Sequence, residues 1–90
     1  MSVYVDALKL WPGSGTIRWC HVIADTEEEL HAMASRCGLK RQWFQTKSFP
    51  HYDAQWRIRQ RLVEAGAIEC SRTEFVGHVR RLRGMELFGQ

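Results

Sequence analysis

The chain has 90 residues, of which 44% are hydrophobic, and a formal net charge of +3. This length supports one folded domain and excludes a second, because two cores would not bury enough apolar surface to be stable separately. No apolar run approaches the roughly 18 residues that span a bilayer, and the N-terminus lacks the basic and then apolar pattern of a signal peptide. We therefore expect a cytoplasmic protein that does not bind membranes. The cysteines are widely spaced without a CxxC pair, which favours buried, reduced thiols at Cys20, Cys37 and Cys70.

Two strands are predicted near the N-terminus. Residues 3–6 form a short β-rich run, and residues 17–23 alternate with the two-residue period of a strand. The side chains expected on one face of this second strand are Ile17, Trp19, His21 and Ile23. The segment 11–15 between the two runs is rich in glycine and predicts a turn. We expect the two strands to be neighbours in one sheet.

The first helix has clear signals at both of its ends. Thr26 and Glu29 form a capping box, in which the hydroxyl of Thr26 accepts a hydrogen bond from the amide of Glu29. Leucine, methionine, alanine and cysteine side chains follow at helical spacing, and Gly38 is suited to the left-handed conformation that ends a helix. The sequence therefore predicts a helix over residues 26–37.

The second half of the chain predicts two more helices and a short strand. Asp53 is suited to cap a second helix, and residues 67–70 fit a third strand because they are too few for a helix. Ser71 and Glu74 form another capping box, which opens a third helix that Gly84 is expected to end. The inward residues of this helix are expected to be Phe75, Val79 and Leu82, and the outward ones Arg80, Arg81 and Arg83.

These elements follow the order strand, strand, helix, helix, strand, helix, which is typical of a small α/β or α+β domain. We expect a single globular domain over residues 1–83, with about three strands and three helices, and a C-terminal tail over residues 84–90. The simplest packing places all of the helices on one face of the sheet.

Positive charge is concentrated in the second half of the chain. Residues 1–35 hold two Lys/Arg against five Asp/Glu, a balance of −3, whereas residues 36–83 hold eleven against four, a balance of +7. This distribution predicts a basic face that could bind phosphates or an acidic partner. A solvated face without any partner is equally compatible with it.

Scattered acids and imidazoles are the candidate catalytic or metal-binding residues, because folding could gather them at strand ends or helix starts, where ligands tend to bind. The candidates for a divalent metal are Asp6, His21, Asp25, His31, His51 and Asp53, and the candidate catalytic residues among them are Asp6, His21, His51 and Asp53. Imidazole and carboxylate suit zinc, iron or manganese, and the acids alone would suit magnesium. No pair of histidines has a recognised ligand spacing such as HExxH. The structural alternative is that Asp25 and Asp53 only cap helices and that His21 is a core residue.

Basic and aromatic side chains form a second set of candidates. Arginine and lysine bind phosphate oxygens, and aromatic rings stack on bases. The candidate ligand-binding residues are Arg41, Trp43, Lys47, Tyr52, Arg57 and Arg61. The alternative is that the aromatic residues belong to the core. The chain has no Walker loop, GxGxxG motif or nucleophile elbow.

Short motifs in a fixed order carry a family resemblance. The resemblance covers about residues 3–70, and the motifs are Val3-Tyr4-Val5-Asp6, His21-Val22-Ile23-Ala24-Asp25, Glu29-Leu30-His31, Trp43-Phe44-Gln45, His51-Tyr52-Asp53 and Gly66-Ala67. Together they resemble domain-of-unknown-function family 4031, a group of small bacterial and phage proteins. The resemblance implies a polar site built from the six acids and imidazoles named above, and a basic residue in the second helix, at Arg59 or Arg61. It implies no established activity.

Three functions are compatible with these observations. The first, which we favour because of the basic segment, is a small module that binds a phosphate-bearing ligand, either a nucleotide or a nucleic acid. The second is a metal-dependent phosphoester hydrolase or nuclease that uses the histidines and acids. The third is a phage-encoded inhibitor or accessory protein that binds a host protein.

Overall fold

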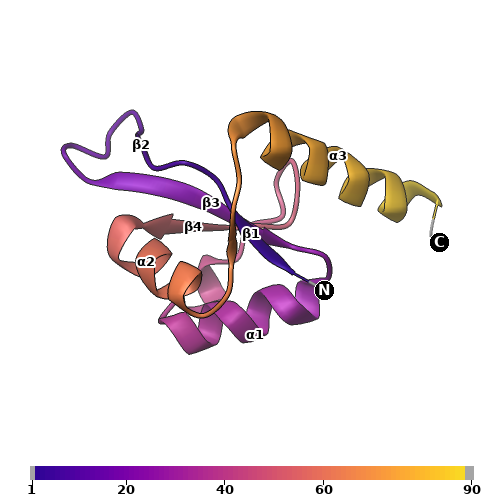
Figure 1. Cartoon of the computed structure of the whole chain (residues 1–90), viewed down its shortest axis with the longest axis horizontal. Coiled ribbons are helices and arrows are strands. Elements are labelled where there is room, and N and C mark those ends of the chain that lie inside the picture. Colours follow the sequence, from indigo (N-terminus) through magenta and orange to yellow (C-terminus); the bar gives the residue numbers. More distant parts are fainter. Residues whose placement is uncertain (1, 89–90) are drawn as a thin grey trace.

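A mixed five-stranded sheet lies at the centre of the computed structural model, which describes residues 2–88 (Figure 1). Its longest strand, β3 (Arg18–Ala24), pairs with three others. Strands β1 (Val3–Val5) and β2 (Lys9–Leu10) lie antiparallel along one edge of β3, and β4 (Tyr52–Gln55) lies antiparallel along the other. Strand β5 (Ile68–Glu69) runs parallel to β1. Strands β1 and β3, the two strands predicted near the N-terminus, are thus neighbours, as expected.

The helices cover both faces of the sheet. Figure 1 shows α1 (Glu27–Cys37) and α2 (Trp56–Glu64) on one side of the strands and α3 (Arg72–Phe88) on the other. Leu30 of α1 and Leu62 of α2 belong to the same larger core as Val22 of β3, whereas Phe75 of α3 belongs to a smaller core with Ile23. The expectation that all helices would share one face is therefore wrong. Strand β1 is buried along its whole length, so both of its faces need a cover.

The first helix begins and ends as predicted. Thr26 accepts a hydrogen bond from the amide of Glu29 at 3.2 Å and donates one from its hydroxyl to the carboxylate of Glu29 at 3.0 Å. Gly38 has φ +95° and its amide donates to the last turn of α1. A β-branched or bulky residue would be strained at that angle, which is why glycine suits the position.

The start of the second helix differs from the prediction. Residues 52–55 form strand β4, and α2 begins at Trp56 after Gln55, whose side chain makes no capping bond. Asp53 is therefore not a helix cap. The reason is non-local: Tyr52 and Ala54 are fully buried against β3, and this burial outweighs the local preference of Asp53 for a cap.

The third helix begins as predicted and ends later. Ser71 and Glu74 exchange the two hydrogen bonds of the capping box, at 2.8 and 3.2 Å. The helix continues through Gly84 to Phe88, so Gly84 does not end it. Glycine inside a helix costs only about 1 kcal/mol relative to alanine, so it is a weak stop. Most of the predicted tail is thus helical, and residues 89–90 lie outside the described residues.

Two further expectations concern the thiols and membrane insertion. The cysteines predicted to be buried and free are so, and burial raises the pKa of the Cys20 thiol to about 12. Over the described residues, no helix combines the length and the apolar character that crossing a bilayer requires.

A candidate phosphate-binding groove beside a histidine and aspartate row

A row of two histidines and two aspartates lies on the face of the sheet that α3 partly covers. Asp6 follows β1, His21 lies on β3, and His51 precedes β4. Asp53 on β4 is the direct cross-strand partner of His21. The ring centroids of the two histidines are 5.7 Å apart. The four residues proposed as catalytic are thus brought together, from three separate segments of the chain.

Asp6 fixes the orientation of His21. One carboxylate oxygen of Asp6 lies 2.8 Å from Nδ1 of His21, and the other accepts the backbone amide of His21 at 2.6 Å. The ring of Trp11 packs on the imidazole at 4.9 Å between centroids. No described residue hydrogen-bonds to Nε2 of His21, and the side chain is 37% exposed. An imidazole held in this way by a carboxylate can accept or donate a proton, or bind a ligand, at Nε2.

His51 differs from His21 because both of its ring nitrogens have partners. Nδ1 donates to the carbonyl of Phe49 at 2.7 Å, and Nε2 lies 3.5 Å from Asp53, an ionic contact that is too long for a strong hydrogen bond. Gln45 donates to the other carboxylate oxygen of Asp53 at 2.6 Å. These contacts close the loop of residues 45–51, whose two ends also pair as a β-bridge. Both ring nitrogens of His51 are thus occupied by contacts within the protein.

The His51–Asp53 pair perturbs the pKa of both groups. Burial by itself lowers the pKa of His51, but the contacts with Asp53 and the Phe49 carbonyl outweigh it and raise the pKa above the ordinary 6.5. Burial by itself raises the pKa of Asp53, but its contacts with His51 and Gln45 outweigh it and lower the pKa. The folded protein therefore favours a charged pair, an imidazolium beside a carboxylate.

We expect the contribution of His51 to stability to fall as the pH rises. Because its pKa is higher in the folded state, the contribution is fully present below pH 6.5 and is lost as the pH rises through the folded-state pKa. Asp53 stays ionised throughout this window, since its pKa lies below 3.8. The measurement is urea unfolding of the wild type and of His51→Gln at a series of pH values above and below 6.5. A difference in free energy of unfolding that is independent of pH would contradict the charged pair.

His31 lies on the opposite face of the sheet. Its Nδ1 contacts the hydroxyl of Tyr52 at 2.8 Å, its Nε2 lies 3.7 Å from Glu27, and the ring of Phe44 packs edge-on at 4.5 Å. Tyr52 belongs to the larger core, which is covered by α1 and α2. His31 is thus a partly buried residue beside the larger core, and it does not meet His21 or His51.

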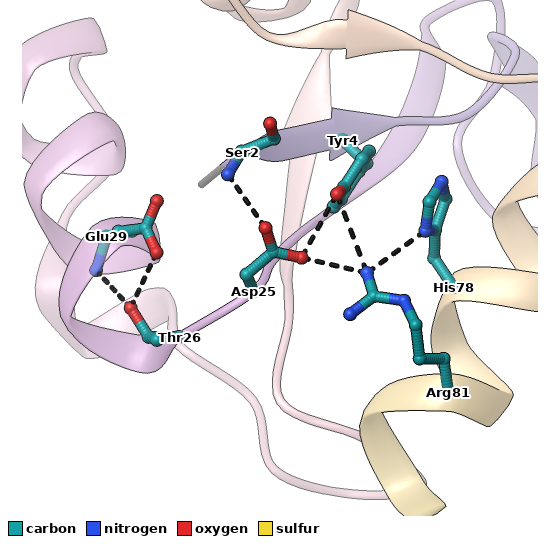
Figure 2. A network of polar contacts seen from close by, with 7 residues as sticks. All are labelled: Ser2, Tyr4, Asp25, Thr26, Glu29, His78 and Arg81. Carbon is teal, nitrogen blue, oxygen red and sulfur yellow. Dashed lines mark hydrogen bonds and ion pairs between the residues drawn. The ribbon is translucent and has the colours of Figure 1, made fainter. Parts of the chain in front are cut away.

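Asp25 belongs to a separate network at one end of the sheet (Figure 2). It accepts hydrogen bonds from the amide of Ser2 at 2.9 Å, the hydroxyl of Tyr4 at 3.0 Å and the guanidinium of Arg81 at 2.8 Å. Arg81 also contacts Nδ1 of His78, whose ring stacks on Tyr4 at 3.9 Å. Burial by itself raises the pKa of Asp25, but Arg81 and its other partners outweigh it and lower the pKa. The network attaches α3 to β1 and β3.

The structure therefore does not gather the six candidate metal ligands around one cavity. Four of them form the row, His31 lies behind the sheet, and Asp25 binds Arg81. Among the side chains that the structure describes, which end at residue 84, no three His, Cys, Asp or Glu residues are placed to share a metal ion.

The predicted basic and aromatic ligand residues do not converge on the row either. Tyr52 is buried against His31, the guanidinium of Arg57 lies over the ring of Trp56 at 5.2 Å, and Arg61 lies beside Gly38 at the end of α1. Arg41 belongs to the short 3-10 helix η1 (Arg41–Trp43), and both Arg41 and Lys47 are exposed. Trp43 is the exception, because it lines a hollow that also contains Asp53.

A groove of about 460 Å³ lies between α3 and the strands, and sequence reasoning missed the residues that make it basic. Its lining contains the Asp6–His21 pair and four cations, which are Lys9, Arg72, Arg80 and Arg83. The other lining residues are apolar: Ala7, Phe49, Phe75, Val76 and Val79. Arg83 donates to the backbone carbonyl of Ser48 and lies 5.9 Å from the ring of Phe49. In the described part of the chain, no Asp or Glu forms an ion pair with any of the four cations.

A signal for this groove was present in the sequence. Arg72, Val76, Arg80 and Arg83 are separated by four, four and three residues, which places them on one stripe of a helix. The prediction that the arginines of this helix point outward to solvent did not consider that they share one side of the helix. A further residue, Arg59 of α2, supports the site from behind, since its Nε donates to the backbone carbonyl of Asp6 at 2.9 Å and it pairs with Glu69.

One comparison with known proteins gives a match. A family model described as "Protein of unknown function (DUF4031)" matches residues 3–82, a range that includes the row, Arg59 and every groove cation except Arg83. No curated protein and no solved structure matches the chain. Because the family model covers most of the 90 residues, the chain belongs to the DUF4031 family.

Proposed function

We propose that the chain binds a phosphate-bearing ligand in the groove between the sheet and α3. The observation that carries the proposal is the set of four cations along one groove, Lys9, Arg72, Arg80 and Arg83, without an acidic ion-pair partner among the described residues. Arginine presents several N–H donors in a fixed plane that matches the oxygens of a phosphate, and each such bond is charge-assisted.

The size and lining of the groove suit a small ligand. Its volume of about 460 Å³ falls within the range of roughly 300–1,000 Å³ that small-molecule sites occupy. Apolar side chains such as Phe75 and Val79 provide contacts beside the charges. The aliphatic stems of the arginines can pack on these side chains while the guanidinium groups contact the ligand.

His21 adds a polar group to the groove. A ring nitrogen of an imidazole that has no partner within the protein can form a hydrogen bond with a phosphate oxygen or a hydroxyl of the ligand. Both oxygens of the nearby Asp6 are engaged by N–H groups of His21 when Nδ1 carries the proton, so the carboxylate is directed toward His21.

The test is a calorimetric titration of the chain with inorganic triphosphate at increasing salt concentration. We expect binding of one triphosphate per chain, with an affinity that falls as salt is added, because partly exposed charges are screened within about 10 Å at 0.1 M ionic strength. Inorganic triphosphate has no sugar or base, so its affinity measures the contribution of the groove cations to phosphate binding. Absence of binding at low salt, or an affinity that salt does not change, would refute the proposal.

A further inference from the structure

We propose that the ligand is a nucleotide and that its base binds in a second hollow, between Trp19 and Trp43, next to the phosphate-binding groove. This inference rests on the proposed function and adds to it the identity of the group attached to the phosphates. The tryptophan hollow has a volume of about 520 Å³ and is lined by the two tryptophans, three glutamines, Asp53 and two aliphatic side chains.

The sheet places the hollow directly beside the groove. His21 lines the groove, and its cross-strand partner Asp53 lines the hollow. Two residues further along β3, Trp19 lines the hollow, and its cross-strand partner on β2 is Lys9 of the groove. The partner of Trp19 on β4 is Gln55, which also lines the hollow. Neighbouring strands lie about 4.8 Å apart. One sugar would therefore bridge a phosphate in the groove and a ring in the hollow.

The side chains of the hollow suit a planar heterocycle. Trp43 is 44% exposed, and the ammonium of Lys40 lies 5.4 Å from the centroid of its ring, so a base that stacks on Trp43 would share the ring with this cation or displace it. Trp19 is fixed in place, because Trp11 stacks on it with 18° between the ring planes. The lining glutamines, Gln42, Gln45 and Gln55, carry amides, and each amide offers both a donor and an acceptor, as the edges of nucleobases do.

The charges of the two cavities also fix which end of a nucleotide enters each of them. The groove is lined by four cations and one carboxylate, whereas Asp53 is the one charged residue among the described residues that line the hollow; Lys40 lies outside this lining, over the ring of Trp43. A phosphate would therefore be repelled from the hollow and attracted to the groove. A base is neutral, and its amino groups can approach a carboxylate. The orientation follows from charge complementarity alone.

The test compares the four common nucleoside triphosphates with inorganic triphosphate in calorimetric titrations. We expect at least one nucleotide to bind about tenfold more tightly than inorganic triphosphate, because stacking of one base on aromatic side chains contributes a gain of this order. A single-stranded tetranucleotide, as a further titrant, distinguishes a strand of nucleic acid from a free nucleotide as the source of the base. Equal affinities for all nucleotides and for inorganic triphosphate would refute the hollow as a base site.

Two variants separate the hollow from the groove. Trp43→Leu should remove the tenfold gain and leave the affinity for inorganic triphosphate unchanged. Trp56→Leu is the matched control, since Trp56 is 45% exposed but lies outside the hollow, and it should change neither affinity. A Trp43→Leu variant that retains the full gain would contradict the inference. Failure of inorganic triphosphate to bind the wild type would refute the groove instead, so the two failures are distinguishable.

Discussion

Replacing Arg72 and Arg80 together by alanine should weaken the binding of inorganic triphosphate by roughly 10- to 100-fold, which corresponds to about 1.4–2.7 kcal/mol. Both side chains line the groove, and neither has an acidic ion-pair partner among the described residues. A hydrogen bond to a charged group contributes about 1.5–3 kcal/mol when it is buried, and solvent screening at this partly open site reduces that value. Calorimetric titration of the variant measures the loss.

A variant with the same net charge controls for long-range electrostatics. Arg41→Ala combined with Arg57→Ala also removes two positive charges, but neither arginine lines the groove. We expect this control to weaken binding less than about threefold at 0.15 M salt, where screening limits the effect of distant charges. Equal losses in the two double variants would show that the net charge, and not the groove, attracts the phosphate.

The Asp25→Ala variant should lower the free energy of unfolding by about 2 kcal/mol. The carboxylate of Asp25 accepts from Ser2, Tyr4 and Arg81, and its removal leaves the largely buried Tyr4 hydroxyl and a guanidinium without this partner. Leaving a buried donor unsatisfied costs about 1–3 kcal/mol. The ion pair with Arg81 adds little to this cost, because the Arg81 side chain is 42% exposed and solvent screens its charge. Urea unfolding at neutral pH measures the loss.

The effect of pH distinguishes the ion pair from a simple loss of packing. Because the pKa of Asp25 is lowered in the folded state, its contribution is present above pH 3.8 and is lost as the pH falls through the folded-state pKa. The difference between wild type and Asp25→Ala should therefore shrink in acid. Glu64→Ala is a suitable control, since the exposed Glu64 has only a 3.5 Å contact with Gln60. An Asp25→Ala variant as stable as the wild type would show that the network in Figure 2 does not contribute to the free energy of unfolding.

Helix starts were predictable from the sequence where the hydrogen bonds that stabilise them are local. The capping boxes at Thr26 and Ser71 use residues three positions apart, so the sequence contains all of the information. Strand β4 was missed because its stability comes from pairing with β3, whose paired residues lie 30 to 36 positions earlier in the chain. The weak local signal was the alternation of the buried Tyr52 and Ala54 with the partly exposed Asp53 and Gln55.

The candidate site was partly predictable, for the same reason. Asp6, His21, His51 and Asp53 meet because they follow or flank strands that prove to be neighbours. His31 is excluded by strand alternation: its partner Tyr52 is adjacent in sequence to Asp53 and therefore faces the other side of the sheet.

The basic groove depends on where α3 lies. Arginines on the outer stripe of an amphipathic helix usually face solvent, and the sequence of α3 does not reveal that the sheet lies beside that stripe. The position of the helix is set by contacts distant in sequence, such as the ion pair between Asp25 and Arg81 and the packing of Phe75 on Ile23.

The most direct measurement of the central claim is a map of the residues that inorganic triphosphate contacts, obtained from backbone amide chemical shifts in a titration followed by NMR. If phosphate binds in the groove, the amides of Lys9, His21, Arg72 and Arg80 should shift together and saturate with one dissociation constant. Shifts centred instead on Arg41, Arg57 and Arg61, which lie outside the groove, would contradict it.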